Sequence, residues 1–262
     1  MKVRDNLNTL ERYQQIIENK HKYIVEDLQE IAGLLADEKE GLQKYPKPNL
    51  EVIQSTKGTI LNYYYDIIIG KYSAGYDIAE IKKDFINLLN LISELWQEKD
   101  LKEFTYGKNP EPYYGTDEYE QVLTLISWGI LFNMDDYNFQ KIIKVRDKVA
   151  TSDILLDFLL SFKDKRNIHK NRVLGNKYLG LIPLIERGNT VNLIPDLQHY
   201  LSKTWYKERS YTGWYNSHKS KHNIYTGYWS FESGALVKIL GLDDSILKGQ
   251  KYYPYDMVHW QG

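Results

Sequence analysis

Apolar residues recur at steps of three and four positions through the first part of the chain. Such spacing places side chains on one face of an α-helix, because the helix repeats every 3.6 residues. It predicts an amphipathic helix of about nine turns. Alternation of apolar and polar residues, which would predict strands, is hard to find anywhere in the sequence, so we expect an all-α fold of roughly nine or ten helices. The residues that define the first helix are Leu7, Leu10, Ile17, Ile24, Leu28, Ile31 and Leu35.

Two clusters of helix-breaking residues interrupt this pattern. Residues 41–49 read GLQKYPKPN, and residues 105–116 read TYGKNPEPYYGT. Proline lacks the backbone N–H that a helix interior needs, and glycine favours turns. The second cluster predicts a domain boundary, with an N-terminal helical domain over residues 1–110 and a C-terminal helical domain over residues 111–262.

The remaining helices follow from the same periodicity. Asp77 and Ser152 stand where N-caps are expected, and Gly241 is placed to end the last helix. Pro183 is expected to kink or shorten its helix. The predicted helices cover residues 50–71, 77–99, 117–132, 135–149, 152–162, 176–187, 194–207 and 227–240, and residues 208–226 are expected to be irregular.

Composition excludes several classes of protein. The 262 residues carry a formal net charge of −1, which argues against a strongly basic nucleic-acid binder. No cysteine is present, so thiolate nucleophiles and cysteine-ligated zinc are excluded. The first residues lack a signal-peptide pattern, and no apolar run approaches the ~18–20 residues that span a bilayer. We expect a cytoplasmic protein.

Glu232 stands in the otherwise apolar stretch GYWSFESGALVKILGLDD, residues 227–244. On the predicted helix it would lie between Trp229 and Leu236. Burial would raise its pKa, as a general acid requires. However, no second catalytic group lies near it in sequence. The alternative is a structural carboxylate that pairs with an arginine, a tyrosine hydroxyl or a tryptophan N–H from another helix, and we favour that interpretation.

His218 and His222 are four residues apart, a spacing that could chelate a metal on a helix. Together with Glu232 they would suggest a metal-dependent hydrolase. Lys219 and Lys221 would repel a cation, and the surrounding residues favour a loop. We therefore do not predict a metal site.

Residues 203–228 combine basic and aromatic side chains. This combination is typical of single-stranded nucleic-acid binding, in which bases stack on aromatic rings. Two alternatives are a long loop whose aromatic residues dock on the core, which we favour, and a protein-recognition surface. The basic residues are Lys203, Lys207, Arg209, Lys219 and Lys221, and the aromatic residues are Trp205, Tyr206, Tyr211, Trp214, Tyr215, Tyr225 and Tyr228.

Two acidic runs also have two interpretations. They could be solvated helix faces, the second favourably placed at a helix N-terminus. They could instead form a negative surface for a basic partner. The first run comprises Glu26, Asp27, Glu30, Asp37, Glu38 and Glu40, and the second comprises Asp117, Glu118 and Glu120.

The sequence contains no motif that assembles a reaction. Neither GxGxxG nor GxxxxGK[ST] is present to bind phosphates, and no GxSxG supplies a nucleophilic serine. We predict no catalytic residue, no cofactor and no metal.

Residues 227–258 resemble the end of the PoNi family of bacterial immunity proteins. The opening residues MKVRDNLNTLERYQQII and the stretch YYYDIIIGKYSAGYDI fit the helical N-terminal domain of that family. The resemblance rests mainly on the order and spacing of a C-terminal signature. Its residues are Tyr228, Trp229, Phe231, Glu232, Gly241, Asp243, Asp244, Tyr252, Tyr253, Pro254 and Asp256.

The resemblance implies a non-enzymatic protein of two helical domains that neutralises a cognate PoNe-type DNase toxin in competition between bacteria. The mechanism expected is stoichiometric occlusion, with the acidic runs as the toxin-binding surface and Glu232 as part of the structural signature. No membrane and no direct nucleic-acid partner is implied. The alternatives left open are a nucleic-acid binder that uses residues 203–228 and a metal-dependent hydrolase.

Overall fold

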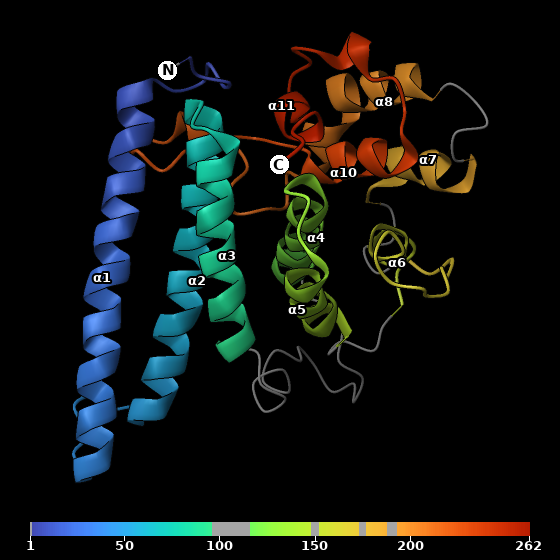
Figure 1. Cartoon of the computed structure of the whole chain (residues 1–262). Helices are drawn as coiled ribbons and strands as arrows, with labels where there is room; N and C mark the ends of the chain where they lie inside the picture. The colour runs from blue at the N-terminus through green and yellow to red at the C-terminus, as the bar shows by residue number, and fades with distance from the viewer. Residues whose placement is uncertain (1, 96–115, 148–151, 173–176, 188–192) are drawn as a thin grey trace. The chain divides into compact units, whose positions relative to one another are not determined.

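The structure is a computed structural model of the chain that describes residues 2–95, 116–147, 152–172, 177–187 and 193–262 (Figure 1). Within these ranges every regular element is helical and none is a strand, so the prediction of an all-α fold with roughly nine or ten helices is confirmed. The chain divides into two compact units. The N-terminal unit comprises Met1–Leu95 and Asn216–Gly227, and the C-terminal unit comprises Trp96–Tyr215 and Tyr228–Gly262. The predicted boundary at residues 105–116 lies, apart from Thr116, outside the described residues, and it stays a prediction.

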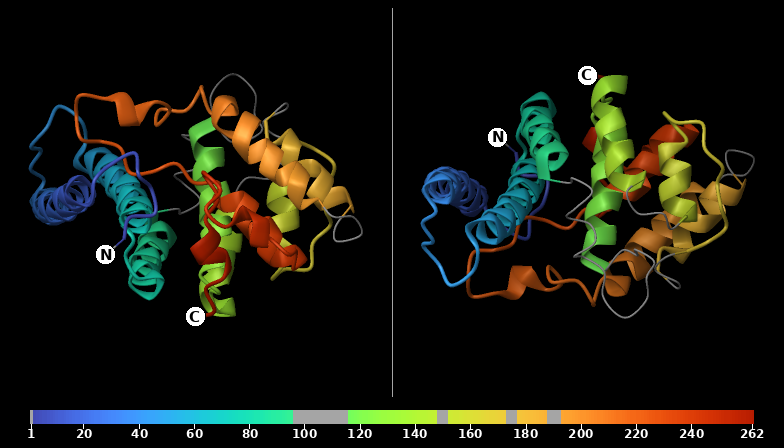
Figure 2. Two further views of the ribbon diagram at one scale, coloured as in Figure 1. Left: turned by 90° about the horizontal axis from the view of Figure 1, so that it is seen from above. Right: turned by 90° about the horizontal axis from the view of Figure 1, so that it is seen from below.

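Three long helices form the N-terminal unit: α1 (Leu10–Glu40), α2 (Asn49–Ala74) and α3 (Ile78–Leu95). The helix α2 packs against both α1 and α3 and lies between them (Figures 1 and 2). Apolar side chains of α1 and α2 fill the contact between these two helices. They are Ile17, Ile24, Ile31, Leu34, Ile53, Ile60 and Ile67.

Local signals fix the ends of these helices. Thr9 caps α1 by accepting a hydrogen bond from the backbone N–H of Arg12 at 3.3 Å. Gly41 and Gly75 end α1 and α2 in the left-handed conformation, with φ of 71° and 91°, which glycine adopts at no steric cost. Asp77 accepts from the N–H of Ala79 at 2.8 Å, in the role predicted for it.

The exposed side of α1 corrects one expectation. Leu7, Leu28 and Leu35 were predicted on the buried face, yet they are 41%, 49% and 44% exposed. The buried stripe consists of Ile17, Ile24 and Ile31 at seven-residue spacing, with residues beside them. Because α1 packs mainly along α2, one narrow face is covered and the flanking apolar residues stay in solvent.

In the C-terminal unit α4 packs against α5, α6 and α10. Trp128 of α4 is fully buried, and its ring lies edge-on to Phe231 of α10 with 5.4 Å between ring centroids. A Cβ atom at Gly234 would lie 2.7 Å from Cγ of Pro254, so glycine allows the C-terminal segment to approach α10 closely. The longer helices of this unit are α4 (Thr116–Leu131), α5 (Asp136–Asp147), α6 (Ile154–Leu160), α7 (Ile182–Arg187), α8 (Ile194–Tyr200) and α10 (Phe231–Leu240).

The remaining helical elements are short. The predicted helix over residues 194–207 is realised as α8, a π-helical turn and a single α turn. The predicted helix over residues 176–187 begins later: Pro183 lies in the first turn of α7, where its missing N–H is tolerated. The short elements are η2 (Leu179–Leu181), η3 (Leu201–Trp205), α9 (Tyr206–Glu208), η4 (Ser217–Lys219), η5 (Ser245–Leu247) and α11 (Tyr255–Val258).

The start of the last long helix differs from the prediction. The helix α10 begins at Phe231 rather than Gly227, so Trp229 is not one of its residues. The preceding residues have no regular structure, and the N–H of Ser230 donates to the carbonyl oxygen of Tyr252 at 2.7 Å. A backbone hydrogen bond to the C-terminal segment thus takes the place of the first helical turn that the sequence suggested.

Asp153, and not the predicted Ser152, caps α6. Its Oδ1 accepts from the N–H groups of Leu155 and Leu156 at 3.0 and 3.1 Å, and from the hydroxyl of Tyr119 at 3.0 Å. We expect Asp153→Ala to lower the free energy of unfolding by about 1–3 kcal/mol, because a buried cap and a tyrosine partner are lost together. Ser152→Ala, measured in the same denaturant titration, should change it by less than about 0.5 kcal/mol. Equal effects would contradict this assignment of the cap.

Candidate functional site

The acidic residues of the first run lie along the second half of α1. Glu26 and Glu38 are exposed, whereas Asp27, Glu30 and Asp37 are half-buried. Lys22 is an exposed neighbour of Glu26, with 3.7 Å between Nζ and Oε1. Such surface pairs contribute little to stability, so the carboxylate of Glu26 stays available to a partner.

Like charges are crowded on this part of α1. Burial raises the pKa of Asp27, and the nearby carboxylates of Glu30 and Glu26 raise it further. A cation placed beside these three residues would relieve the repulsion. The arrangement therefore suits a positively charged partner better than a neutral one.

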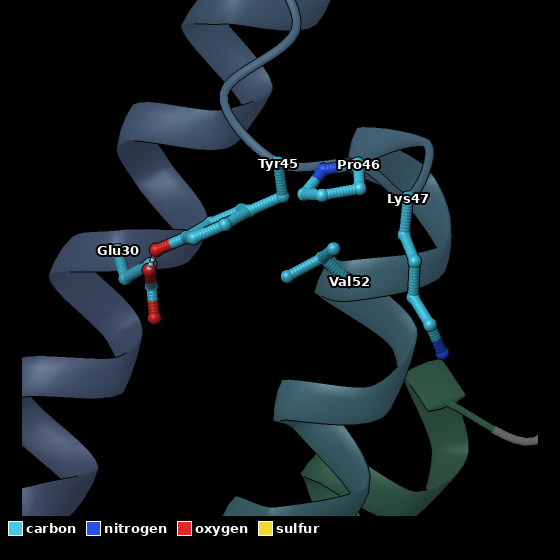
Figure 3. A pocket seen from close by; sticks show the side chains of 5 residues that line it. All are labelled: Glu30, Tyr45, Pro46, Lys47 and Val52. Atoms are coloured by element: carbon cyan, nitrogen blue, oxygen red, sulfur yellow. Dashed lines mark hydrogen bonds between the residues drawn. The ribbon is translucent and has the colours of Figure 1, made fainter.

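A shallow hollow of about 430 Å³ adjoins the acidic residues where α1 and α2 are connected (Figure 3). Tyr45 donates a short hydrogen bond from its hydroxyl to Oε1 of Glu30, and Nζ of Lys44 lies 3.6 Å from the same oxygen. Pro46 and Val52 supply apolar walls. The Glu30 carboxylate in this hollow is already paired, so the hollow itself does not indicate a cation site.

The second acidic run is placed differently. Oε1 of Glu120 accepts hydrogen bonds from the hydroxyls of Tyr178 and Tyr211, both at 2.5 Å, and lies 3.7 Å from Nε of Arg209. Glu120 is therefore part of the interior network of the C-terminal unit. Glu118 is half-buried, and the side chain of Asp117 lies outside the described part of the chain.

Glu232 is buried and accepts three hydrogen bonds on one oxygen. Trp205 donates from Nε1 at 2.7 Å, Ser230 from its hydroxyl at 2.8 Å, and Arg209 from Nη2 at 3.0 Å. An arginine and a tryptophan N–H are among the partners considered from the sequence. Burial raises the pKa of Glu232, while Arg209, Ser230 and Trp205 oppose that rise.

Arg209 links this carboxylate to the rest of the unit. Its side chain is only 1% exposed, its guanidinium lies 4.0 Å from the ring centre of Tyr178, and Nη1 donates to the hydroxyl of Tyr200 at 3.4 Å. Oε2 of Glu208 lies 3.4 Å from the same nitrogen. The sequence places Arg209 among the basic residues of the 203–228 segment, and an arginine was one of the partners considered for Glu232, but which arginine was not predicted. The available signal was that a buried Glu232 needs a cationic partner and that Arg209 stands among aromatic residues.

The aromatic residues of the 203–228 segment pack on one another. The ring of Tyr206 stacks on those of Tyr215 and Tyr252, with centroids 4.6 and 5.5 Å apart. Trp214 lies 6.0 Å from Trp205 in a stacked arrangement. Ring faces that contact each other are not presented to bases, so this geometry favours the docked-loop interpretation over a stacking platform.

The two histidines of the possible metal pair lie in the part of this segment that belongs to the N-terminal unit. His218 is in the single turn η4, and its ring contacts that of Tyr225 at 5.9 Å. His222 is exposed, outside any helix. Among the described residues, no group of three or more His, Cys, Asp or Glu side chains could hold a metal ion.

The rest of the C-terminal signature organises the end of the chain. Asp244 is 2% exposed and accepts hydrogen bonds from Tyr253 at 2.6 Å and from the ring of His259 at 2.8 Å. Gly241 ends α10 with φ of 61°, and Asp243 accepts from the N–H of Ser245 at 3.1 Å. These contacts hold the final residues against the C-terminal unit.

Comparison with known proteins gives two matches to one family. Residues 4–144 match the model of the PoNe immunity protein (PoNi), N-terminal, and residues 151–257 match that of PoNe immunity proteins (PoNi), C-terminal. The crystal structure of protein PA2201 from Pseudomonas aeruginosa is similar in fold, with a TM-score of 0.60 and 17% sequence identity over 98% of this chain and 97% of that chain. No curated protein matches significantly.

The network around Glu232 leads to a stability prediction. We expect Glu232→Ala to lower the free energy of unfolding by about 3–5 kcal/mol, because it leaves the Arg209 guanidinium buried without its nearest carboxylate. Glu232→Gln should cost less, since an amide oxygen still accepts from Trp205 and Ser230. Thermal and urea unfolding measure both. If Glu232→Ala unfolds like the wild-type protein, the network is not structural.

Proposed function

The chain belongs to the PoNi family, the immunity proteins of PoNe nuclease toxins, and from that premise we propose that it binds a cognate DNase toxin and neutralises it by one-to-one occlusion. The observation that carries the proposal is that both family models match, and that together they cover nearly the whole chain. The toxin has to be bound before it reaches DNA, so we propose that this binding takes place in the cytoplasm. Among the described residues no helix is both long and apolar enough to cross a membrane.

Electrostatics supports occlusion as the mechanism. A DNase neutralises phosphates with lysine and arginine, so its substrate-binding face is basic. The acidic half of α1 offers that face carboxylates in place of phosphates, which speeds association and favours the correct orientation. Glu120 is held by two tyrosines and Arg209 in the interior of the C-terminal unit and is left out of this surface. Glu30 is kept although Tyr45 and Lys44 engage one of its oxygens, because its side chain is 32% exposed. The surface that we propose consists of Glu26, Asp27, Glu30, Asp37 and Glu38.

The other functions considered from the sequence have less support. A nucleic-acid binder using residues 203–228 would need exposed aromatic faces, yet those rings stack on one another. A metal-dependent hydrolase would need Glu232 near His218 and His222. Instead, Glu232 is engaged by Trp205 and Arg209.

Co-expression tests the proposal directly. The chain is expressed together with the toxin domain encoded beside it, and survival and complex formation are measured. We expect survival and a one-to-one complex that co-purifies, because occlusion is stoichiometric. A folded protein that neither protects the cells nor binds the toxin would refute the proposal. Steeply salt-dependent binding of this chain to DNA would then favour the nucleic-acid alternative.

Charge reversal tests the acidic surface. We expect the combined change Glu26→Lys, Asp27→Lys and Glu30→Lys to slow association with an inactive toxin by roughly tenfold or more at low salt, and by less at high salt, because steering is screened. Stopped-flow association kinetics measure this. Glu26→Lys is compared with Glu186→Lys, an equal change of charge at an exposed position of α7. If the two single variants associate equally fast, local placement of charge on α1 has no role.

A further inference from the structure

The solvent face of α1 carries an exposed row of apolar side chains. Val25, Leu28, Ala32 and Leu35 follow one another at steps of three, four and three residues, so they form one line along the helix. Val25 is 54% exposed, and Leu28 and Leu35 are nearly as exposed. Single exposed apolar residues are common, but a continuous row on one helix is typical of an interaction surface.

A second row on the same helix is acidic. Glu26, Glu30 and Asp37 follow at steps of four and seven residues and therefore form a line on the opposite edge of the exposed face. Between residues 26 and 40 the sequence has six acidic residues and a single basic one, Lys39. The exposed face is thus apolar along one edge and negative along the other.

Small side chains separate the two rows. Gly33 and Ala36 are exposed on the centre line, flanked by Gln29 and Glu40. A Cβ atom at Gly33 would meet nothing within 4 Å, so packing within the chain does not require glycine there. Glycine is among the least favourable residues in a helix interior. What it offers at this position is room for another backbone or a flat side chain to approach the helix axis closely.

We infer that this face of α1, from Val25 to Glu40, is the docking face for the toxin, with Gly33 at the centre of the contact. The inference rests on the proposed function and adds the interface to it. We call these residues the α1 face. Within the described part of the N-terminal unit this face is exposed, because α2 packs along the Ile17, Ile24 and Ile31 side of the helix.

Charge decides which occupant suits the α1 face. A second copy of this chain would bring the same acidic rows together, and opposed like charges disfavour association. A nucleic-acid-binding protein presents lysines and arginines, which match the acidic row, and the long stems of such side chains pack well on apolar surface. The apolar row then contributes mainly to slow dissociation, and the acidic row to fast association.

Gly33→Gln tests the centre of the face. Glutamine favours helix more than glycine does, so the variant should keep or raise the melting temperature. Its side chain would occupy the space that the partner needs, and we expect the affinity for inactive toxin to fall by about 30-fold or more. Gly58→Gln is the matched control, because Gly58 is also an exposed helical glycine with no atom within 4 Å of an added Cβ atom. This control should bind like the wild type.

The apolar row is tested by Leu28→Ser combined with Leu35→Ser. Both residues are exposed, so the fold should be retained, and calorimetric titration with inactive toxin should show an affinity at least about tenfold lower. The chain alone is examined in parallel by sedimentation equilibrium. A wild-type dimer that these serines convert to a monomer would overturn the inference in favour of a second copy.

The remaining outcomes separate the inference from the proposed function. If the wild-type chain binds the toxin and Gly33→Gln and the double serine variant bind equally well, the docking face lies elsewhere and only the inference is refuted. If the wild-type chain, folded, does not bind the toxin at all, the proposed function fails and the inference fails with it. If binding is lost in the α1 variants and retained in Gly58→Gln, the α1 face is the interface.

Discussion

The buried guanidinium of Arg209 is the constraint on which the C-terminal unit depends. Taking a cation out of water costs several kcal/mol unless it is paired and hydrogen-bonded. Here Glu232 of α10 supplies the negative charge at 3.0 Å, Tyr200 of α8 accepts a hydrogen bond, and the ring of Tyr178 covers the guanidinium face. The same carboxylate also holds the indole of Trp205. The position of α10 relative to Trp205 of η3 and to Arg209 is therefore set by polar geometry as well as by apolar packing.

In the N-terminal unit, α1 is held mainly by apolar packing. Most contacts of α1 run along α2, so a narrow line of isoleucines holds it in place. Much of the remaining helix surface is exposed, which allows Gly33, half-exposed leucines and crowded carboxylates to coexist on it. Residues that serve the fold and residues proposed to serve binding thus occupy adjacent strips of one helix, since Leu28 lies one turn from both Ile24 and Ile31.

Sequence reasoning succeeded where structure is decided locally. Glycines at 41, 75 and 241, with their left-handed backbone, and Asp77 at the start of α3 are readable from a few neighbouring residues. Predictions were wrong or incomplete where segments far apart in the sequence determine which side chains are buried. The apolar spacing of α1 does not reveal that α2 covers the Ile24 side and leaves Leu28 exposed. The sequence allowed an arginine as the partner of Glu232 but did not identify Arg209. The acidic residues of α1 could be identified from the sequence. The hydrogen bonds that Glu120 accepts from Tyr178 and Tyr211 in the interior could not.

Substitutions in the buried Glu232–Arg209 network and substitutions on the α1 face give different information. Glu232 and Arg209 contact side chains from several elements, so any change there alters the fold, and a loss of binding would say nothing about the interface. Leu28 and Leu35 are about half exposed and a Cβ atom at Gly33 would meet nothing within 4 Å, so a change in affinity in a variant that stays folded reports the partner. The net charge of −1 does not reveal the acidic surface of α1, because the acidic excess of this helix is offset elsewhere in the chain. Partner preference therefore follows from where the charges lie and from the apolar row beside them, and the total charge does not predict it.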